Sequence, residues 1–308
     1  MKKYVGPLLL LVTALIWGFA FPFQKAAAEI PPMTLNAVRS FVAVLFLFPM
    51  IPVMDRVRHT GRRFLSGGRL DFTRREWIGG AVCGLVLATA SSLQQLGLHE
   101  GADAGKTAFL TALYVVIVPL LGLFLGKRVG LRLWVSIAVA VGGFWLLCIK
   151  DGFTIASSDL VLLLCAFVCA LHILSADHFS PSVDGVRMSA LQFFFVFLFT
   201  GTMGLIVEGI PDLSLIVRHV FPLLYLGIGS SGIAYTLQIL GQRSTNHALA
   251  SVLMSLESVF GALGGALMLG EVMTPREYLG CAVVFVAVLL AEVELPIKKK
   301  QSNIEKTQ

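Results

Sequence analysis

Apolar residues in this chain fall into long blocks separated by short polar connections. Ten blocks can be marked, at positions 6–24, 34–52, 77–98, 103–126, 130–149, 159–178, 186–207, 219–241, 246–268 and 275–294. A helix needs about 20 apolar residues to cross the hydrocarbon core of a bilayer, and the blocks lack the alternation typical of half-buried strands. The pattern therefore predicts an all-α polytopic membrane protein with ten transmembrane helices.

The composition agrees with this prediction. Of the 308 residues, 56% are hydrophobic and 14% are charged, whereas about a quarter of the residues in a soluble domain are charged. The first block resembles a secretory signal, because Lys2 and Lys3 precede it and Ala26 to Ala28 follow it. Its length and the nine blocks after it favour an uncleaved first span.

Positive charge is distributed unevenly between the two sides that the blocks define. With the N-terminus inside, the inner connections hold 18 of the 24 lysines and arginines and the outer connections hold 5. Because the positive side faces the cytoplasm, we expect both termini to be cytoplasmic and the protein to lie in a bacterial inner (plasma) membrane. The net charge of +6 then reflects topology in a lipid bilayer, and we expect no nucleic-acid partner.

The two halves of the chain resemble each other at a shift of about 143 residues. The stretch "SSLQQLGLHEGADAGKTAFLTALY" corresponds to "IAYTLQILGQRSTNHALASVLMSLE", and "LLGLFLGKRV" corresponds to "ALGGALMLGEV". Equivalent positions are Gln95 and Gln238, Tyr114 and Glu257, and Gly126-Lys127 and Gly270-Glu271. Each half has an odd number of blocks, so the second half should be inverted in the membrane, as in transporters that open a midplane site to each side in turn.

The whole pattern resembles the drug/metabolite transporter superfamily, and within it the EamA-type permeases. The resemblance rests on the ten blocks in two halves, the early "LIWGFAFPFQK", and the paired "LG-K/E" signatures that close the fourth and ninth blocks. It implies a basket of helices around a central cavity, with the fifth and tenth spans to one side. It also implies a carrier of small solutes, often an exporter of amino acids or related metabolites. We expect residues 1–150 to be the first five-helix repeat, 151–297 the inverted second repeat, and 298–308 a basic cytoplasmic tail.

One glutamate interrupts the apolar stretch "ASVLMSLESVFGALGGALML". An ionised carboxylate is expensive in hydrocarbon, and intramembrane ionisable groups are functional by default. Glu257 is therefore a candidate ligand or proton-coupling group. Alternatively, it pairs with Arg39 or accepts hydrogen bonds from Ser255 or Ser258, or it sits protonated in a tight helix interface.

The depth of each residue follows from the helical rise of 1.5 Å per residue. Trp17, Tyr114 and Glu257 all lie about 16 Å from the ends of their blocks, near the midplane of a core about 30 Å thick. A carboxylate, a phenol and an indole at one depth suit a solute with an amine or an aromatic part. Arg39, about 8 Å below the outer surface, either snorkels to the interface or, with Asn36 one turn away, recognises a carboxylate.

Other polar residues within the blocks complete the predicted site. His172 is either a proton relay or a satisfied histidine in a helix interface, and the glutamines bond either to the solute or to neighbouring helices. The predicted substrate-binding residues are Trp17, Arg39, Gln95, Tyr114, His172, Gln192, Tyr235, Gln238 and Glu257.

The cysteines offer one alternative chemistry. All five lie inside apolar blocks, and their odd number argues against a disulfide framework. Cys165, Cys169 and His172 share a helical face and could hold a soft metal, but two small apolar residues and one polar residue packing in a helix are the favoured explanation. We therefore expect neither a metal nor a cofactor.

Three other functions were compared with the sequence: an intramembrane protease, a passive channel and an ATP-driven transporter. The "GSSG" string at 229–232 matches intramembrane serine proteases, with Ser231 as nucleophile and His247 as base, yet the two differ by roughly 10 Å in depth. A passive channel would repeat polar rings along one path, and the polar groups cluster at the midplane instead. No phosphate-binding glycine loop is present, so a solute or proton gradient should supply the energy. We expect a transporter and not an enzyme, and both a monomer and a homodimer fit the sequence.

Overall fold

The computed structural model describes residues 4–58, 71–100, 102, 104–127, 129–148, 157–270 and 272–292, and these residues form helices and turns without any strand. The first helices are α1 (Val5–Ala26), α2 (Pro32–Arg58), α3 (Arg74–His99), α4 (Ala104–Ala112), α5 (Tyr114–Phe124), α6 (Leu131–Cys148) and α7 (Ser157–Phe179). After the short turn η2 (Ser180–Ser182) come α8 (Gly185–Val207), α9 (Leu213–Arg218), α10 (Val220–Leu224), the π-helix η3 (Tyr225–Ala234), α11 (Tyr235–Gln242), α12 (His247–Met254), α13 (Glu257–Leu269) and α14 (Pro275–Glu292). The predicted tail at 298–308 lies outside the described residues.

Within the described residues, eight helical stretches are long and apolar enough to cross a membrane. They are Val5–Ala26, Pro32–Arg56, Arg74–His99, Thr107–Phe124, Ser157–Ser182, Gly185–Val207, Val220–Gln242 and His247–Met268. Each matches one of the ten predicted blocks. The other two blocks correspond to α6 and α14, which have 18 residues each. The chain is therefore an all-helical integral membrane protein.

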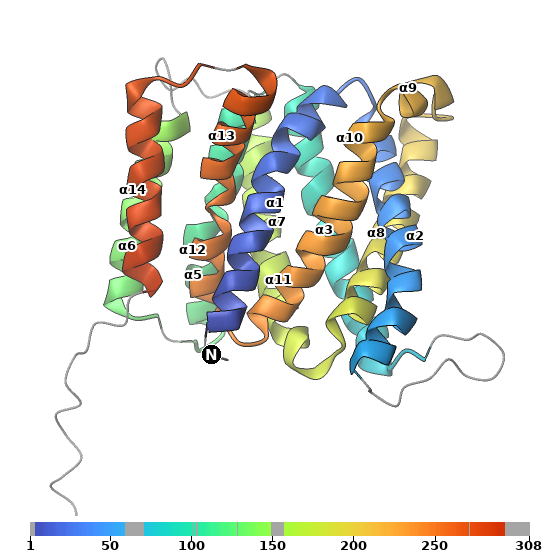
Figure 1. The fold of residues 1–308 in the computed structure, drawn as a ribbon, viewed down its shortest axis with the longest axis horizontal. Coiled ribbons are helices and arrows are strands. Elements are labelled where there is room, and N and C mark those ends of the chain that lie inside the picture. The colour runs from blue at the N-terminus through green and yellow to red at the C-terminus, as the bar shows by residue number, and fades with distance from the viewer. Residues whose placement is uncertain are drawn as a thin grey trace, which may run out of the picture.

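The helices stand side by side in one bundle, with α1 near its centre (Figure 1). α1 packs against α13 on one side and against η3 and α11 on another, while α2 packs against α8 and η3. α3 packs between α7 and α8. α6 and α14 pack mainly on each other at one edge of the bundle, which is the place implied for the fifth and tenth spans.

Two of the predicted spans are interrupted near their middle by a local turn, here called a break, at which the backbone keeps α-helical dihedral angles. In block 103–126, α4 gives way to α5 at Leu113, and in block 246–268, α12 gives way to α13 at Ser255 and Leu256. At each break a backbone N–H donates to the third preceding carbonyl, which tightens the helix locally. Both blocks still form one helical stretch each that is long enough to cross a membrane, and hydropathy does not locate the turn because an apolar block has the same hydropathy with or without it.

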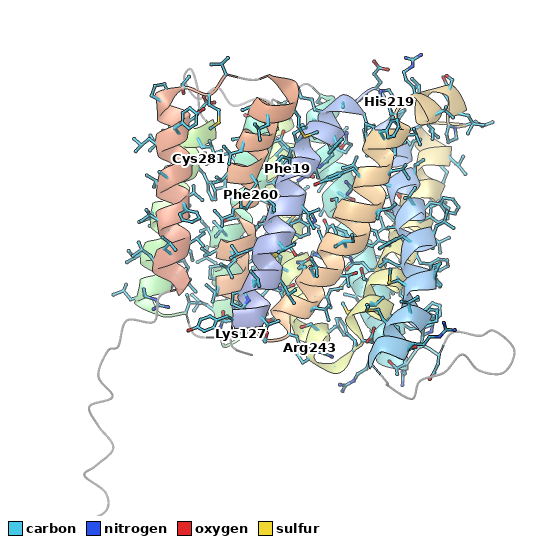
Figure 2. The ribbon with its side chains drawn as sticks, in the orientation of Figure 1. Phe19, Lys127, His219, Arg243, Phe260 and Cys281 are labelled. Carbon is cyan, nitrogen blue, oxygen red and sulfur yellow. The ribbon has the colours of Figure 1, made fainter. Side chains whose placement is uncertain are left out.

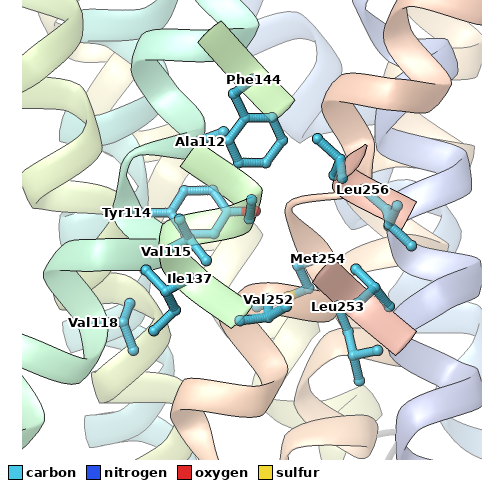
Figure 3. Close-up of a cluster of buried hydrophobic side chains, with 14 of the residues drawn as sticks. Ala112, Tyr114, Val115, Val118, Ile137, Phe144, Val252, Leu253, Met254 and Leu256 are labelled. Atoms are coloured by element: carbon cyan, nitrogen blue, oxygen red, sulfur yellow. The ribbon is translucent and has the colours of Figure 1, made fainter. Parts of the chain in front are cut away.

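Buried apolar side chains surround both breaks (Figure 3). They come from α4, α5, α6 and α12 and belong to one core cluster. The residues labelled in the figure are Ala112, Tyr114, Val115, Val118, Ile137, Phe144, Val252, Leu253, Met254 and Leu256. Because this cluster encloses both breaks, the broken segments are held in defined positions by side-chain packing.

Polar contacts fix α8 to α2 at both of its ends. At one end Arg187, 3% exposed, donates to both carboxylate oxygens of Asp55 at 2.8 and 2.5 Å and to the carbonyl of Asp71 at 3.1 Å. At the other end Glu208 accepts hydrogen bonds from the backbone N–H and the hydroxyl of Thr34, both at 2.8 Å. These contacts join helices of the two halves of the chain.

Replacing Gly143 with alanine should destabilise the protein, whereas the same change at Gly142 should not. A Cβ at position 143 would lie 2.8 Å from Val284 N and 3.0 Å from Gly280 O of α14, while a Cβ at 142 would meet no described atom within 4 Å. Overpacking costs about 1–3 kcal/mol, and alanine in an open helix position is about 1 kcal/mol better than glycine. Thermal unfolding in detergent measures both variants. Equal unfolding temperatures for the two variants would contradict the close contact of α6 with α14.

Candidate functional site

A small cavity lies inside the bundle, at the level where α4–α5 and α12–α13 are broken. Its volume is about 60 Å³, enough for a few water molecules, so a bound solute requires the helices to move apart. The cavity is lined by Trp17, Ala20, Phe21, Gln24, Arg39, Leu87, Gln94, Thr111, Tyr114, Cys169, His172, Ile173, Ser230, Tyr235, Gln238 and Glu257.

Seven of the nine predicted substrate-binding residues line this one cavity, although they come from six helices. They are Trp17, Arg39, Tyr114, His172, Tyr235, Gln238 and Glu257. The other two, Gln95 and Gln192, lie outside its lining and are 1% and 0% exposed. The tertiary structure therefore gathers most of the candidate chemistry at one place.

Tyr114 and Glu257 are in direct contact in this cavity. The Tyr114 hydroxyl donates a hydrogen bond to Glu257 Oε1 at 3.0 Å, and the two residues are 3% and 7% exposed. Each is the first residue of a helix that resumes after a break. The two residues that the repeat makes equivalent thus meet each other.

The other structural partners considered for Glu257 are engaged elsewhere. The Ser255 hydroxyl donates to Val252 O at 2.8 Å, and the Ser258 hydroxyl donates to Ala108 O at 3.3 Å. In the described part of the chain, the Arg39 guanidinium forms no ion pair with a carboxylate. The expected pairing of Glu257 with Arg39 or with a neighbouring serine is therefore wrong, and Tyr114 takes that place.

Aromatic rings form one wall of the cavity. The rings of Trp17 and Tyr235 have centroids 4.6 Å apart at an interplanar angle of 55°, and Trp17 Nε1 donates to Ser230 O at 3.4 Å. Tyr235 also makes edge contacts with His172 at 5.7 Å and Phe193 at 5.3 Å. This wall offers a flat apolar surface that ends in polar groups, which suits the apolar part of a solute.

His172 is held by Gln192. His172 Nε2 donates to Gln192 Oε1 at 3.0 Å, so Gln192 acts on the cavity through the imidazole. On the same face, Cys165 donates to Ala90 O at 3.2 Å and lies 3.8 Å from Cys169, sulfur to sulfur. Among the described residues, no group of three or more His, Cys, Asp and Glu side chains is placed to hold a metal ion.

The structure adds polar residues that sequence reasoning missed. Gln24, Gln94, Thr111 and Ser230 line the cavity, and Gln94 Nε2 donates to Thr111 Oγ1 at 3.5 Å. Gln94 and Gln95 are adjacent, and neighbours on a helix point about 100° apart. The sequence signals a polar pair there, but only the packing of α3 decides that Gln94 faces the cavity.

The sequence model of the EamA-like transporter family, in the drug/metabolite transporter superfamily, matches residues 4–149 and again residues 156–292. The chain belongs to the EamA-like transporter family. An uncharacterized transporter of Archaeoglobus fulgidus is 27% identical over 296 residues, which cover 96% of this chain and 88% of that protein. The uncharacterized transporter YoaV of Bacillus subtilis is 22% identical over 282 residues, 88% of this chain and 90% of that protein.

A solved crystal structure shows that this EamA-like fold is shared. It superposes with a TM-score of 0.76 over 94% of this chain and 97% of the other chain, at 17% sequence identity. This similarity supports the fold alone.

The protease alternative has no catalytic dyad in this EamA-like transporter. Ser231 lies in η3, and its hydroxyl has no hydrogen-bond partner in the described part of the chain. His247 is the first residue of α12 and packs against Gly122, and its Nε2 likewise has no partner there. A serine nucleophile needs a base within hydrogen-bond reach, and the structure records no hydrogen bond between these two residues, as their difference in depth predicted.

Replacing Tyr114 with phenylalanine should lower the affinity for the transported solute about two- to tenfold. The change removes a buried hydrogen bond to Glu257, and such a bond contributes about 0.5–1.5 kcal/mol. Tyr225→Phe is a matched control, because its hydroxyl donates to Ile16 O at 2.9 Å and the residue does not line the cavity. Binding of labelled solute to the purified variants measures the difference. An unchanged affinity for Tyr114→Phe would show that the Tyr114 hydroxyl plays no part in solute binding.

Proposed function

We propose that this EamA-like transporter is a secondary carrier for a small organic solute, such as an amino acid or a related metabolite. The observation that carries the proposal is the buried contact of Glu257 with Tyr114, inside a cavity where two broken helices meet. Transporters place their substrate and coupling-ion sites near the midplane on discontinuous helices. A buried carboxylate that faces a cavity is a functional group by default.

Glu257 has two chemical roles that fit this position. As a carboxylate it binds the amino group of the solute, and as a proton acceptor it couples solute movement to a proton gradient. In the first role the amino group of the solute neutralises the carboxylate, and in the second a bound proton does. When the solute or the proton leaves on the other side, the carboxylate becomes charged again until the next one binds. The gradient of the solute or of the proton supplies the energy.

The carrier is proposed to have ten spans in two inverted five-helix repeats. Three observations support this. The family model matches the chain twice; Tyr114 and Glu257, equivalent in the two halves, are in contact; and Gly126 and Gly270, also equivalent, both have positive φ, at 74° and 67°. A glycine in the left-handed conformation ends a helix without strain, so both halves close their broken spans in the same way.

We propose that both termini face the cytoplasm of a bacterial cell. Lys127 and Arg243 lie at the end of the bundle that holds the N-terminus, and His219 lies at the opposite end (Figure 2). At the end with the N-terminus, Lys127 pairs with Asp177, and Arg243 donates to the carbonyls of Ser180 and Val183. Polar contacts between helices therefore close this side.

The cavity leans towards the other end of the bundle. Its lining reaches Gln24, near the end of α1, and Gln94, in the last turns of α3. With the N-terminus cytoplasmic, we interpret the polar contacts at that end as the closed inner side of the carrier. Opening of the inner contacts would then admit a cytoplasmic solute, and we propose export as the direction.

Transport into proteoliposomes tests the function directly. Labelled amino acids and related metabolites would be offered singly, with and without a pH gradient, to vesicles with the purified protein and to empty vesicles. The proposal expects saturable flux of at least one solute and acceleration by unlabelled solute on the other side. Flux that never saturates would indicate a channel, and no flux above that of empty vesicles would contradict a carrier for these solutes. Lower retention of the moved solute in cells that produce the protein would establish export.

A further inference from the structure

Arg39 is a buried cation in the cavity wall. It is 5% exposed and lines the cavity, so it does not snorkel to the membrane surface. Its Nε has no hydrogen-bond partner, and its guanidinium forms no ion pair with a carboxylate in the described part of the chain. An arginine remains charged in proteins, so the cavity wall holds a charged guanidinium that has no carboxylate at ion-pair distance among the described residues.

We propose that Arg39 binds the carboxylate of the solute, so that this carrier accepts organic acids and requires the acid group. This inference rests on the proposed function and narrows its substrate class. A buried charge without a partner costs several kcal/mol, and a solute carboxylate removes that cost. Its two oxygens also match the two-pronged donor geometry of a guanidinium.

The charges of the lining favour a carboxylate over an anion of higher charge. Arg39 is the one lysine or arginine among the lining residues, and Glu257 is the one carboxylate. A single guanidinium compensates a single negative charge, whereas a phosphate dianion would remain partly uncompensated beside Glu257. When Glu257 is protonated the site is complementary to a simple carboxylate, and when it is ionised the site is complementary to a zwitterionic amino acid.

The arrangement of helices keeps the two charged groups apart. Arg39 belongs to α2, which packs on α8 and η3, whereas Glu257 belongs to α13, which packs on α1. In Figure 1, α13 and α2 lie on different sides of α1. The backbones of α2 and η3 are in close contact beside Arg39, because a Cβ added to Gly227 of η3 would lie 2.9 Å from Arg39 O. The solute therefore meets the cation and the carboxylate on separate helices, with Trp17 and Tyr235 lining the same space.

Matched solutes test the requirement for an acid group. Each set consists of an amino acid, its decarboxylated amine and its deaminated acid: alanine, ethylamine and propionate; leucine, isopentylamine and 4-methylpentanoate; phenylalanine, phenethylamine and phenylpropionate. Binding to the purified protein is measured with labelled solutes, and transport is measured separately in proteoliposomes. We expect every solute that binds to carry a carboxylate, and the amines to bind at least tenfold more weakly than their amino acids.

Three variants separate recognition from folding. Arg39→Gln should weaken carboxylate binding about 10- to 100-fold, as for the loss of a hydrogen bond to a charged group. Arg39→Lys keeps the charge but loses the paired donors, so its binding should fall between wild type and Arg39→Gln. Arg218→Gln, on a side chain that is 65% exposed, is the control and should bind like wild type. Without solute, Arg39→Gln should unfold at the same or a higher temperature than wild type, because it removes an uncompensated buried charge.

The outcomes distinguish the carrier function from the binding of a carboxylate by Arg39. Carboxylates that bind through Arg39 without being transported would sustain the inference and contradict the carrier function. Amines that bind or are transported as well as their amino acids would overturn the inference and leave the carrier function in place. Absence of binding by every carboxylate, or equal binding by Arg39→Gln, would also overturn it. A lower unfolding temperature for solute-free Arg39→Gln would assign Arg39 to helix packing instead.

Discussion

Replacing Glu257 with glutamine should lower the flux of the transported solute about 10- to 100-fold and abolish its dependence on a pH gradient. The amide keeps the shape of the side chain and still accepts the hydrogen bond of Tyr114. It carries no charge and cannot exchange a proton. A hydrogen bond to a charged group contributes about 1.5–3 kcal/mol, and about 1.4 kcal/mol corresponds to a factor of ten. The flux into proteoliposomes at several pH values measures the effect.

The control for this prediction is Glu100→Gln, an exposed glutamate at the end of α3. It changes the net charge of the protein by the same amount and should transport like wild type. Full transport by Glu257→Gln at all pH values would assign the carboxylate a structural role. Loss of flux with the gradient dependence retained would identify Glu257 as a ligand for the solute and place the coupling proton elsewhere.

Replacing Arg187 with methionine should lower the free energy of unfolding by about 1.5–3 kcal/mol, because it removes hydrogen bonds between charged groups that are largely shielded from solvent. Arg187 and Asp55 are joined by two hydrogen bonds, and their side chains are 4% and 15% exposed. The pair fixes the start of α8 to the end of α2. Unfolding of the purified protein in detergent, by heat or by a denaturant, measures the loss.

Arg218→Met is the matched control for this prediction. Arg218 pairs with Glu29 at 3.5 Å, and both side chains are more than 60% exposed. Ion pairs at the surface contribute at most about 1 kcal/mol, so this variant should be nearly as stable as wild type. A similar loss for both variants would show that the buried pair contributes no more than an exposed one.

Much of the architecture could be read from the pattern of apolar residues. The blocks of about 20 residues predicted the helices with ends within a few residues, because length and hydropathy suffice to identify a span. The repeat shift made Tyr114 and Glu257 equivalent and their spacing put both near the midplane, and in the structure they are in contact. Such a contact fits the proposed inverted arrangement, because residues at equivalent positions of two inverted halves can meet at the axis that relates them.

The sequence did not reveal features that depend on backbone hydrogen bonds, such as a turn within a helix, or on the rotation of a helix about its axis, such as the direction of a side chain. The breaks at Leu113 and at Ser255 and Leu256 lie in mainly apolar blocks whose hydropathy does not mark the turn. Arg39 could equally have paired with Glu257 or pointed to the membrane surface, and in the structure it does neither. Sequence spacing fixes which residues share a helix face, but the neighbouring helices decide what that face meets.

The sequence by itself determined that this is a membrane protein of apolar helices in two similar halves, with a few polar groups at mid-depth. These properties follow from composition, periodicity and self-similarity, which need no knowledge of contacts between helices. Only the tertiary structure decided that seven of the nine candidate residues share one cavity, that Tyr114 binds Glu257, and that Arg39 Nε has no hydrogen-bond partner among the described residues. These facts depend on the packing of six helices around one space, and interactions between distant segments set that packing.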